Sequence, residues 1–99
     1  MSPHSIAISG IQSAQLRLNA SAHNVANLTT PSFRPLRVEQ SAVAGGGSTA
    51  RVTRSPDPSE VDLVREIIDQ IRAKTQFMSS VRFAAVAVET RGTLVDLLV

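Results

Sequence analysis

The sequence predicts an all-α protein: an antiparallel two-helix hairpin or coiled coil, with a short N-terminal helix, a long C-terminal helix, and a small β-hairpin or flexible loop between them. Apolar residues recur at alternating steps of three and four over residues 5–27 and again over residues 57–99. This is the spacing of one face of a helix. The longer stripe exceeds what the shorter helix can cover, so we expect the hairpins to assemble into larger helical bundles.

The N-terminal helix is predicted from Ser5 to about Asn27, because Asn tolerates a left-handed C-cap and Pro31 prevents continuation. At about 1.5 Å per residue it would be roughly 35 Å long. Its apolar and small stripe is formed by Ile11, Ala14, Leu18, Ser21, Val25 and Leu28.

The segment between the helices alternates in polarity over residues 36–43 and 49–54, on either side of the turn residues Gly45, Gly46 and Gly47. This pattern predicts a β-hairpin, with a flexible linker as the alternative. The glycines are not followed by the Lys-Ser/Thr pair of a phosphate-binding loop. Three segments result: an N-terminal helix and elbow (residues 1–35), a hairpin or linker (36–56) and a C-terminal helix (57–99).

The C-terminal helix is predicted to start after Asp57, which can serve as its N-cap, with Pro58 at the first position and Glu60 in a capping box. It would span roughly 60 Å and leave about 25 Å of its stripe bare. The stripe contains Val64, Ile67, Ile71, Met78, Val81, Ala85, Val88, Val95 and Val99. Lys74 interrupts it, and either reaches out to solvent or sets the register of pairing.

Composition excludes several functions. The chain has no cysteine, hence no disulfide framework and no cysteine-based zinc site. Residues 1–54 carry five arginines against one glutamate, a net charge of +4, whereas residues 55–99 carry five cations against seven acids, or −2. The arginines have no aromatic platform beyond Phe33, so we expect no nucleic-acid binding. Without a secretory signal or a long apolar run, we expect a soluble protein with no direct membrane insertion.

No catalytic, cofactor-binding or metal-binding residues are expected. Ser21 and His23 are two residues apart on a helix and therefore do not face one another. Asp62, Glu66 and Asp69 approach the spacing of a carboxylate metal site, but no histidine follows at ligand spacing. We interpret these three acids as a solvated face, and the protein as not an enzyme.

The most specific stretch is residues 21–34, Ser-Ala-His-Asn-Val-Ala-Asn-Leu-Thr-Thr-Pro-Ser-Phe-Arg. It ends a helix with two amides three residues apart, followed by hydroxyls, a proline turn, an aromatic residue and an arginine. Asn24 and Asn27 can bridge to the backbone of the following loop and fix the angle at which the chain leaves the helix. On physical grounds alone, a plain helix C-cap and turn is the alternative.

This stretch resembles the signature of the bacterial flagellar rod and hook proteins, in which Asn-(Leu/Ile/Val)-Ala-Asn ends the N-terminal helix and precedes Thr, Pro, Gly, an aromatic and a basic residue. The matching residues are Asn24, Val25, Ala26, Asn27, Thr30, Pro31, Phe33 and Arg34. Ser32 replaces the usual Gly and would strain a turn that needs positive φ. Residues 61–77 and 93–98 also resemble the C-terminal helix of this family. The chain departs from the family at Ser80, where Asn is common, and over residues 84–92.

The resemblance implies a proximal-rod-like structural subunit of the flagellar basal body. In that family the terminal helices pair as a coiled coil, and many copies stack into the rod that crosses the periplasm and serves motility. Subunits leave by the flagellar type III export apparatus without a cleaved signal, and their partners are other copies and other rod proteins. No cofactor is implied. The alternative is a small helical regulatory or chaperone-like module that binds partner helices.

Two groups of residues carry this prediction. The structural elbow comprises Asn24, Asn27, Pro31 and Phe33. Helix-pairing and assembly contacts are expected from Ile11, Leu18, Val25, Ile67, Ile71, Met78, Val81 and Val88.

Overall fold

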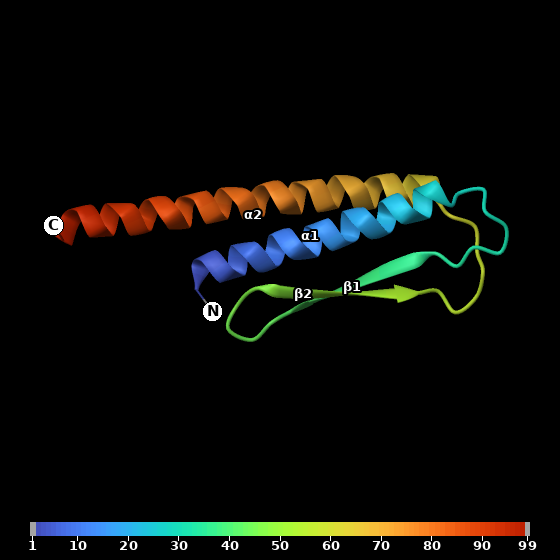
Figure 1. Cartoon of the computed structure of the whole chain (residues 1–99), viewed down its shortest axis with the longest axis horizontal. Helices are drawn as coiled ribbons and strands as arrows, with labels where there is room; N and C mark the ends of the chain where they lie inside the picture. Colours follow the sequence, from blue (N-terminus) through green and yellow to red (C-terminus); the bar gives the residue numbers. More distant parts are fainter. Residues whose placement is uncertain (1, 99) are drawn as a thin grey trace.

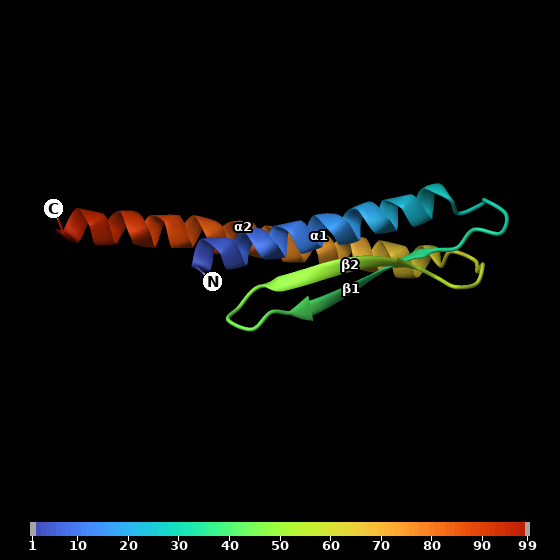
Figure 2. The same cartoon turned by 60° about the horizontal axis from the view of Figure 1, so that its bottom comes forward.

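The computed structural model describes the backbone of residues 2–98 and the side chains of residues 2–89. Its elements are helix α1 (Pro3–Ala26), strand β1 (Leu36–Ala42), strand β2 (Ser48–Arg54) and helix α2 (Leu63–Leu98). The two helices lie side by side and antiparallel, and the hairpin packs on α1 rather than on α2 (Figure 1, Figure 2). The molecule is a thin rod with extents of 64 × 23 × 14 Å.

The predicted all-α class is wrong, because the middle of the chain forms a two-stranded antiparallel sheet. Leu36 pairs with Arg54 and Val38 with Val52, so these side chains share one face of the hairpin. The order of helix, hairpin and helix agrees with the predicted layout. Of the two alternatives for residues 36–56, the structure contains the hairpin.

The hairpin turn depends on its glycines. Gly45, Gly46 and Gly47 have φ values of 88°, 105° and 88°, which glycine adopts without steric cost. A Cβ on Gly46 would lie 2.7 Å from Cδ1 of Ile6, so glycine also lets the turn approach α1. Next to the turn, the Ser48 N–H donates to the Ser9 hydroxyl (3.1 Å). The turn is thereby fixed to the first half of α1.

Helix α2 begins later than predicted. Its N-cap is Asp62, whose carboxylate accepts a backbone N–H three residues on (3.2 Å), and not Asp57. The segment before it is held instead by the loop after α1: the Ser59 N–H donates to the carbonyl of Phe33 (3.2 Å). This long-range hydrogen bond keeps the predicted first turn out of the helix.

The two helices differ in length, as expected, but by less. Helix α1 has 24 residues and α2 has 36. At about 1.5 Å per residue, α2 therefore extends about 18 Å further than α1, instead of 25 Å. Figure 1 shows this overhang as the C-terminal end of α2, which passes beyond the start of α1. The overhang has no neighbour from α1.

Small residues form the contact between the helices. Ala14 of α1 and Ala73 of α2 are completely buried, and Gly10 lies against Ser80. On α2 the positions that face α1 recur at steps of four and three: Glu66, Gln70, Ala73, Phe77, Ser80, Ala84 and Ala87. Small side chains let the two backbones approach closely, so this interface buries little large apolar surface.

The tight contact at Gly10 yields a test. Gly10→Val should lower the free energy of unfolding by about 2 kcal/mol, because the added carbons would collide with Ser80 and force the helices apart. Gly10→Ala should be close to neutral, since the Ser80 hydroxyl can rotate and alanine favours the helix by about 1 kcal/mol. The matched control is Gln12→Val on the exposed side of α1. Urea unfolding followed by circular dichroism measures all three, and an equal loss in Gln12→Val would contradict the packing described.

Candidate functional site: the elbow and the apolar face

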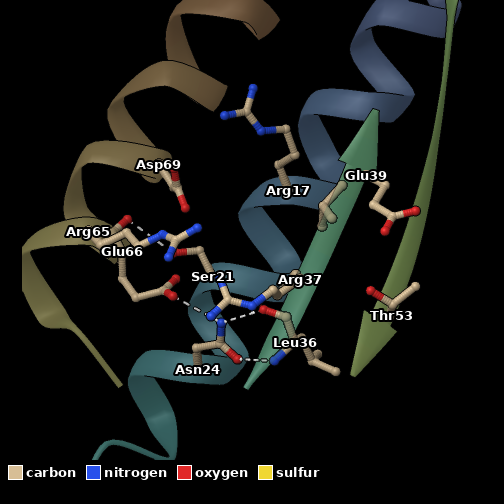
Figure 3. A pocket seen from close by; sticks show the side chains of 12 residues that line it. Arg17, Ser21, Asn24, Leu36, Arg37, Glu39, Thr53, Arg65, Glu66 and Asp69 are labelled. Atoms are coloured by element: carbon tan, nitrogen blue, oxygen red, sulfur yellow. Dashed lines mark hydrogen bonds between the residues drawn. The ribbon is translucent and has the colours of Figure 1, made fainter. Parts of the chain in front are cut away.

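Asn24 is the central residue of the elbow. It is 2% exposed, and its amide pairs with both backbone groups of Leu36, the first residue of β1. Nδ2 donates to the Leu36 carbonyl (2.9 Å), and Oδ1 accepts the Leu36 N–H (2.8 Å), as Figure 3 shows. The side-chain amide thus supplies the donor and the acceptor that a neighbouring strand would otherwise offer to Leu36. This pair of bonds sets where the hairpin starts relative to the end of α1.

The same amide also reaches α2. Nδ2 of Asn24 donates to Oε1 of Glu66 (3.0 Å), a carboxylate that is buried between the helices. Ser21 donates to the Glu66 carbonyl (3.1 Å), and Gln70 donates to the Ser21 hydroxyl (3.1 Å). Asn24 therefore joins α1, β1 and α2 in one polar network. Throughout the described side chains, every buried polar side-chain atom has a hydrogen-bond partner.

Asn27 acts locally. Its Nδ2 donates to the His23 carbonyl (2.9 Å) at the end of α1, and its Oδ1 accepts from the Thr30 hydroxyl (3.0 Å). The Thr30 N–H also donates to the Asn27 carbonyl (3.0 Å). Asn27 thus closes the helix end and the first turn of the loop. The two asparagines of the signature have separate structural roles.

The rest of the elbow, residues 31–33, brings the chain back to the C-terminal end of α1. Pro31 is exposed, and Ser32 has φ = 58°, in the left-handed region that favours glycine. The ring of Phe33 lies 5.7 Å from that of His23 between centroids, and the Arg54 guanidinium lies 5.9 Å from the Phe33 ring centre. Phe33 therefore connects the end of α1 to the end of β2.

The strain at Ser32 can be measured. Ser32→Gly should raise the free energy of unfolding by about 0.5 to 1 kcal/mol, because a non-glycine residue pays about 1–2 kcal/mol for this conformation and the more flexible unfolded chain offsets part of the gain. Ser32→Ala keeps the strain and should change the value by only a few tenths. Chemical denaturation compares the two. A stabilisation of the same size in both variants would show that backbone strain is not the cause.

A polar pocket of about 270 Å³ lies between α1, β1 and α2 (Figure 3). Its charged lining residues are Arg17, Arg37, Glu39, Arg65, Glu66 and Asp69. Three arginines and three carboxylates leave no excess of one charge, so the pocket does not select an anionic or a cationic ligand. The Ser21 hydroxyl in this pocket makes structural hydrogen bonds: it donates to the Glu66 carbonyl and accepts from Gln70.

The three acids that we expected to form one solvated face lie in three different environments. Asp62 caps α2, Glu66 is buried against Asn24, and Asp69 lines the pocket. The expectation was therefore wrong for Glu66. Within the described side chains, no cluster of three or more histidine, aspartate or glutamate residues could hold a metal ion. In the same part of the chain, neither helix combines the length and apolar character that crossing a membrane requires.

Helix geometry shows where the predicted assembly residues lie. Two sides of α1 are occupied, one by α2 through Ala14 and one by the hairpin through Ser9. A helix turns about 100° per residue, so Ile11, Leu18 and Val25 lie on a third side, roughly a quarter-turn past the α2 contact and turned away from the hairpin.

On α2 the predicted assembly residues lie on the matching side. Asp69 points into the pocket beside β1 (Figure 3). The α2 residues that face α1 include Glu66 and Ala73, and at about 100° per residue Ile67 and Ile71 lie on the other side of them from Asp69. Because the helices are antiparallel, this side of α2 and the third side of α1 face the same way. Together they form a surface that we call the apolar face, made of Ile11, Leu18, Val25, Ile67, Ile71, Met78, Val81 and Val88. The hairpin covers the opposite side of the helix pair.

The apolar face is largely open. Its five α2 residues are 42–60% exposed, and its three α1 residues are half-buried at the edge of the interface. These residues therefore do not form the centre of the contact between α1 and α2, which corrects the pairing part of our prediction. Their part in contacts between copies stays a prediction. Sequence reasoning missed Glu66 and Ala73, although a second heptad of small and polar residues on α2 marked that interface.

Comparisons with models of known protein families and with curated proteins found no match to this chain. The resemblance to flagellar rod proteins therefore rests on the residues of the elbow and of the C-terminal helix.

Proposed function

We propose that the chain is a structural subunit of the bacterial flagellar rod, which assembles with other copies and with other rod proteins through its helices. The observation that carries the proposal is the elbow signature, residues 24–34, at the junction of α1 and the hairpin. Its matching residues have structural tasks there: Asn24 pairs with Leu36 and Glu66, and Asn27 closes the helix end. Signature residues that hold the elements of the subunit together fit a protein whose role is structural.

The apolar face supports the self-assembly part of the proposal. Apolar patches of this extent on monomers usually mark interaction surfaces. The face is continuous across both helices, and the hairpin leaves it uncovered. An elongated subunit with its polar network on one side and apolar residues on the other can be covered by neighbours along its length. Repeated contacts that do not close into a ring would build a tube.

Export and location follow from the same proposal. The subunit leaves the cytoplasm through the flagellar type III apparatus and becomes part of the rod that crosses the periplasm. Its partners are copies of itself, other rod proteins and the export apparatus. It needs no cofactor, and motility is the process that it serves.

Deletion of the gene tests the proposal. A strain without the protein should lose swimming motility and accumulate basal bodies that lack a complete rod, and the unmodified gene should restore both. Complementation with an Asn24→Ala, Asn27→Ala double variant should restore neither, although the purified variant keeps most of its helix content. A deletion strain that swims and builds complete rods would contradict the proposal and favour a regulatory module that binds partner helices.

A further inference from the structure

The apolar face is large enough to hold a second copy of the chain. Where α1 and α2 lie together it is about 36 Å long and two helices, or about 20 Å, wide, a footprint of roughly 700 Å². The overhang of α2 adds about 18 Å of a single helix. Stable dimers bury about 800 Å² per partner. A contact over most of the face and the overhang would therefore approach the usual size.

The charges on the face distinguish between orientations. Lys74 lies within the apolar face, between Ile71 and Met78, and Arg82 and Glu89 lie at its outer edge. All three charged side chains are exposed, and among residues 2–89 none of them is in an ion pair. Both cations precede the acid along α2. A parallel, in-register pair would set each charge against its own kind, whereas an antiparallel pair brings cations opposite Glu89.

The overhang leads to the same orientation. In an antiparallel pair, the midpoint between Lys74 and Glu89 falls near Val81, and the midpoint between Arg82 and Glu89 falls near Ala85. With the symmetry axis midway between these two positions, residues 88–98 of one copy lie along about residues 69–79 of the other. The part of α2 that α1 does not reach is then covered by the partner's α2.

We infer that two copies pair through their apolar faces about a two-fold axis between Val81 and Ala85, with each α2 antiparallel to the partner's α2. The two α2 helices then run side by side over residues 69–98, about 45 Å, and each α1 lies beside the partner's overhang, with the hairpins on the two outer sides. This inference goes beyond the proposed function and does not depend on it. If the chain is a rod subunit, the dimer is its unassembled form, and it must separate before other copies can use the same face.

Single-cysteine variants of the full chain test the pairing, because the natural sequence contains no cysteine. Val81→Cys and Ala85→Cys lie at the proposed axis, Ile67→Cys lies at one end of the face, and Thr49→Cys on the hairpin is a control. In the proposed dimer the two Ile67 positions are about 40 Å or more apart. Under mild oxidation, Val81→Cys or Ala85→Cys should form a disulfide-linked dimer at least about tenfold faster than the other two variants.

Two outcomes would overturn the inference. If Ile67→Cys crosslinks as fast as Val81→Cys and Ala85→Cys, the helices are parallel. If neither axis variant exceeds Thr49→Cys, the face does not pair with a second copy. As a second readout, Glu89→Lys should weaken dimerisation roughly tenfold at low salt, since it replaces two attractive contacts by repulsive ones. The exposed control Glu39→Lys should not. Crosslinking of purified protein is independent of motility, so this inference and the proposed function can fail separately.

Discussion

Replacing Asn24 by alanine should lower the free energy of unfolding by about 3 kcal/mol, the largest effect that we expect from any single residue of the elbow. The change removes three hydrogen bonds, two to Leu36 and one to Glu66. It leaves a backbone N–H and a buried carboxylate oxygen without their partner, and each such group costs about 1–3 kcal/mol. Urea unfolding at equal protein concentration measures the loss.

Asn27→Ala is the matched control, because it changes the same residue type three positions further on, just past the end of α1. The hydrogen bonds of Asn27 are exposed and local, so we expect a loss of about 1 kcal/mol. Helix content without denaturant should be nearly unchanged in both variants. If Asn27→Ala costs as much as Asn24→Ala, the junction of three elements does not depend on the buried amide as we describe.

Val81→Glu should weaken self-association at least about 100-fold, the largest effect that we expect on assembly. Val81 lies in the apolar face and is 42% exposed in the single chain. Burying an unpaired carboxylate there on association would cost several kcal/mol, and about 2.7 kcal/mol corresponds to 100-fold. Light scattering after size-exclusion chromatography, over a range of concentrations, measures the change.

Phe83→Glu is the control for this variant. Phe83 is also on α2 and is 46% exposed, but it lies about half a turn of the helix away from Val81, outside the apolar face. The same charge at a similar exposure should leave association within a few-fold of the unmodified protein. Equal weakening by both variants would mean that general charge, and not burial of this face, controls assembly.

The sequence was sufficient to predict both helices and the stripe of large apolar residues, because each has a strong local pattern. For residues 36–56 it gave the hairpin only as one of two alternatives, within an all-α class that is wrong. It was misleading about which stripe of α2 packs on α1. Large residues such as Ile71 dominate any ranking by hydrophobicity, whereas the contact is formed around Ala73 and Gly10, where small size matters more than apolar area. Close packing of backbones is a property of two helices together and is hard to detect in either one alone.

The errors at the elbow have a similar cause. Asp57 and Asp62 are equally good caps by residue type, and a hydrogen bond from Ser59 to the distant Phe33 decides between them. Asn24 was expected to bridge to the following loop, and it bonds instead just beyond that loop, to Leu36 at the start of β1. Its contact with Glu66, 42 residues away, depends on how the helices pair and has no local signal. The conflict at Ser32, by contrast, was visible once the usual glycine was seen to be absent.

Sedimentation velocity of the unmodified chain at low micromolar concentration tests whether one copy, unable to cover its own apolar face, associates with others. We expect a dimer or larger species, with a thermal unfolding midpoint that rises with protein concentration. A fully folded monomer throughout this range, with a midpoint that does not change with concentration, would contradict this expectation.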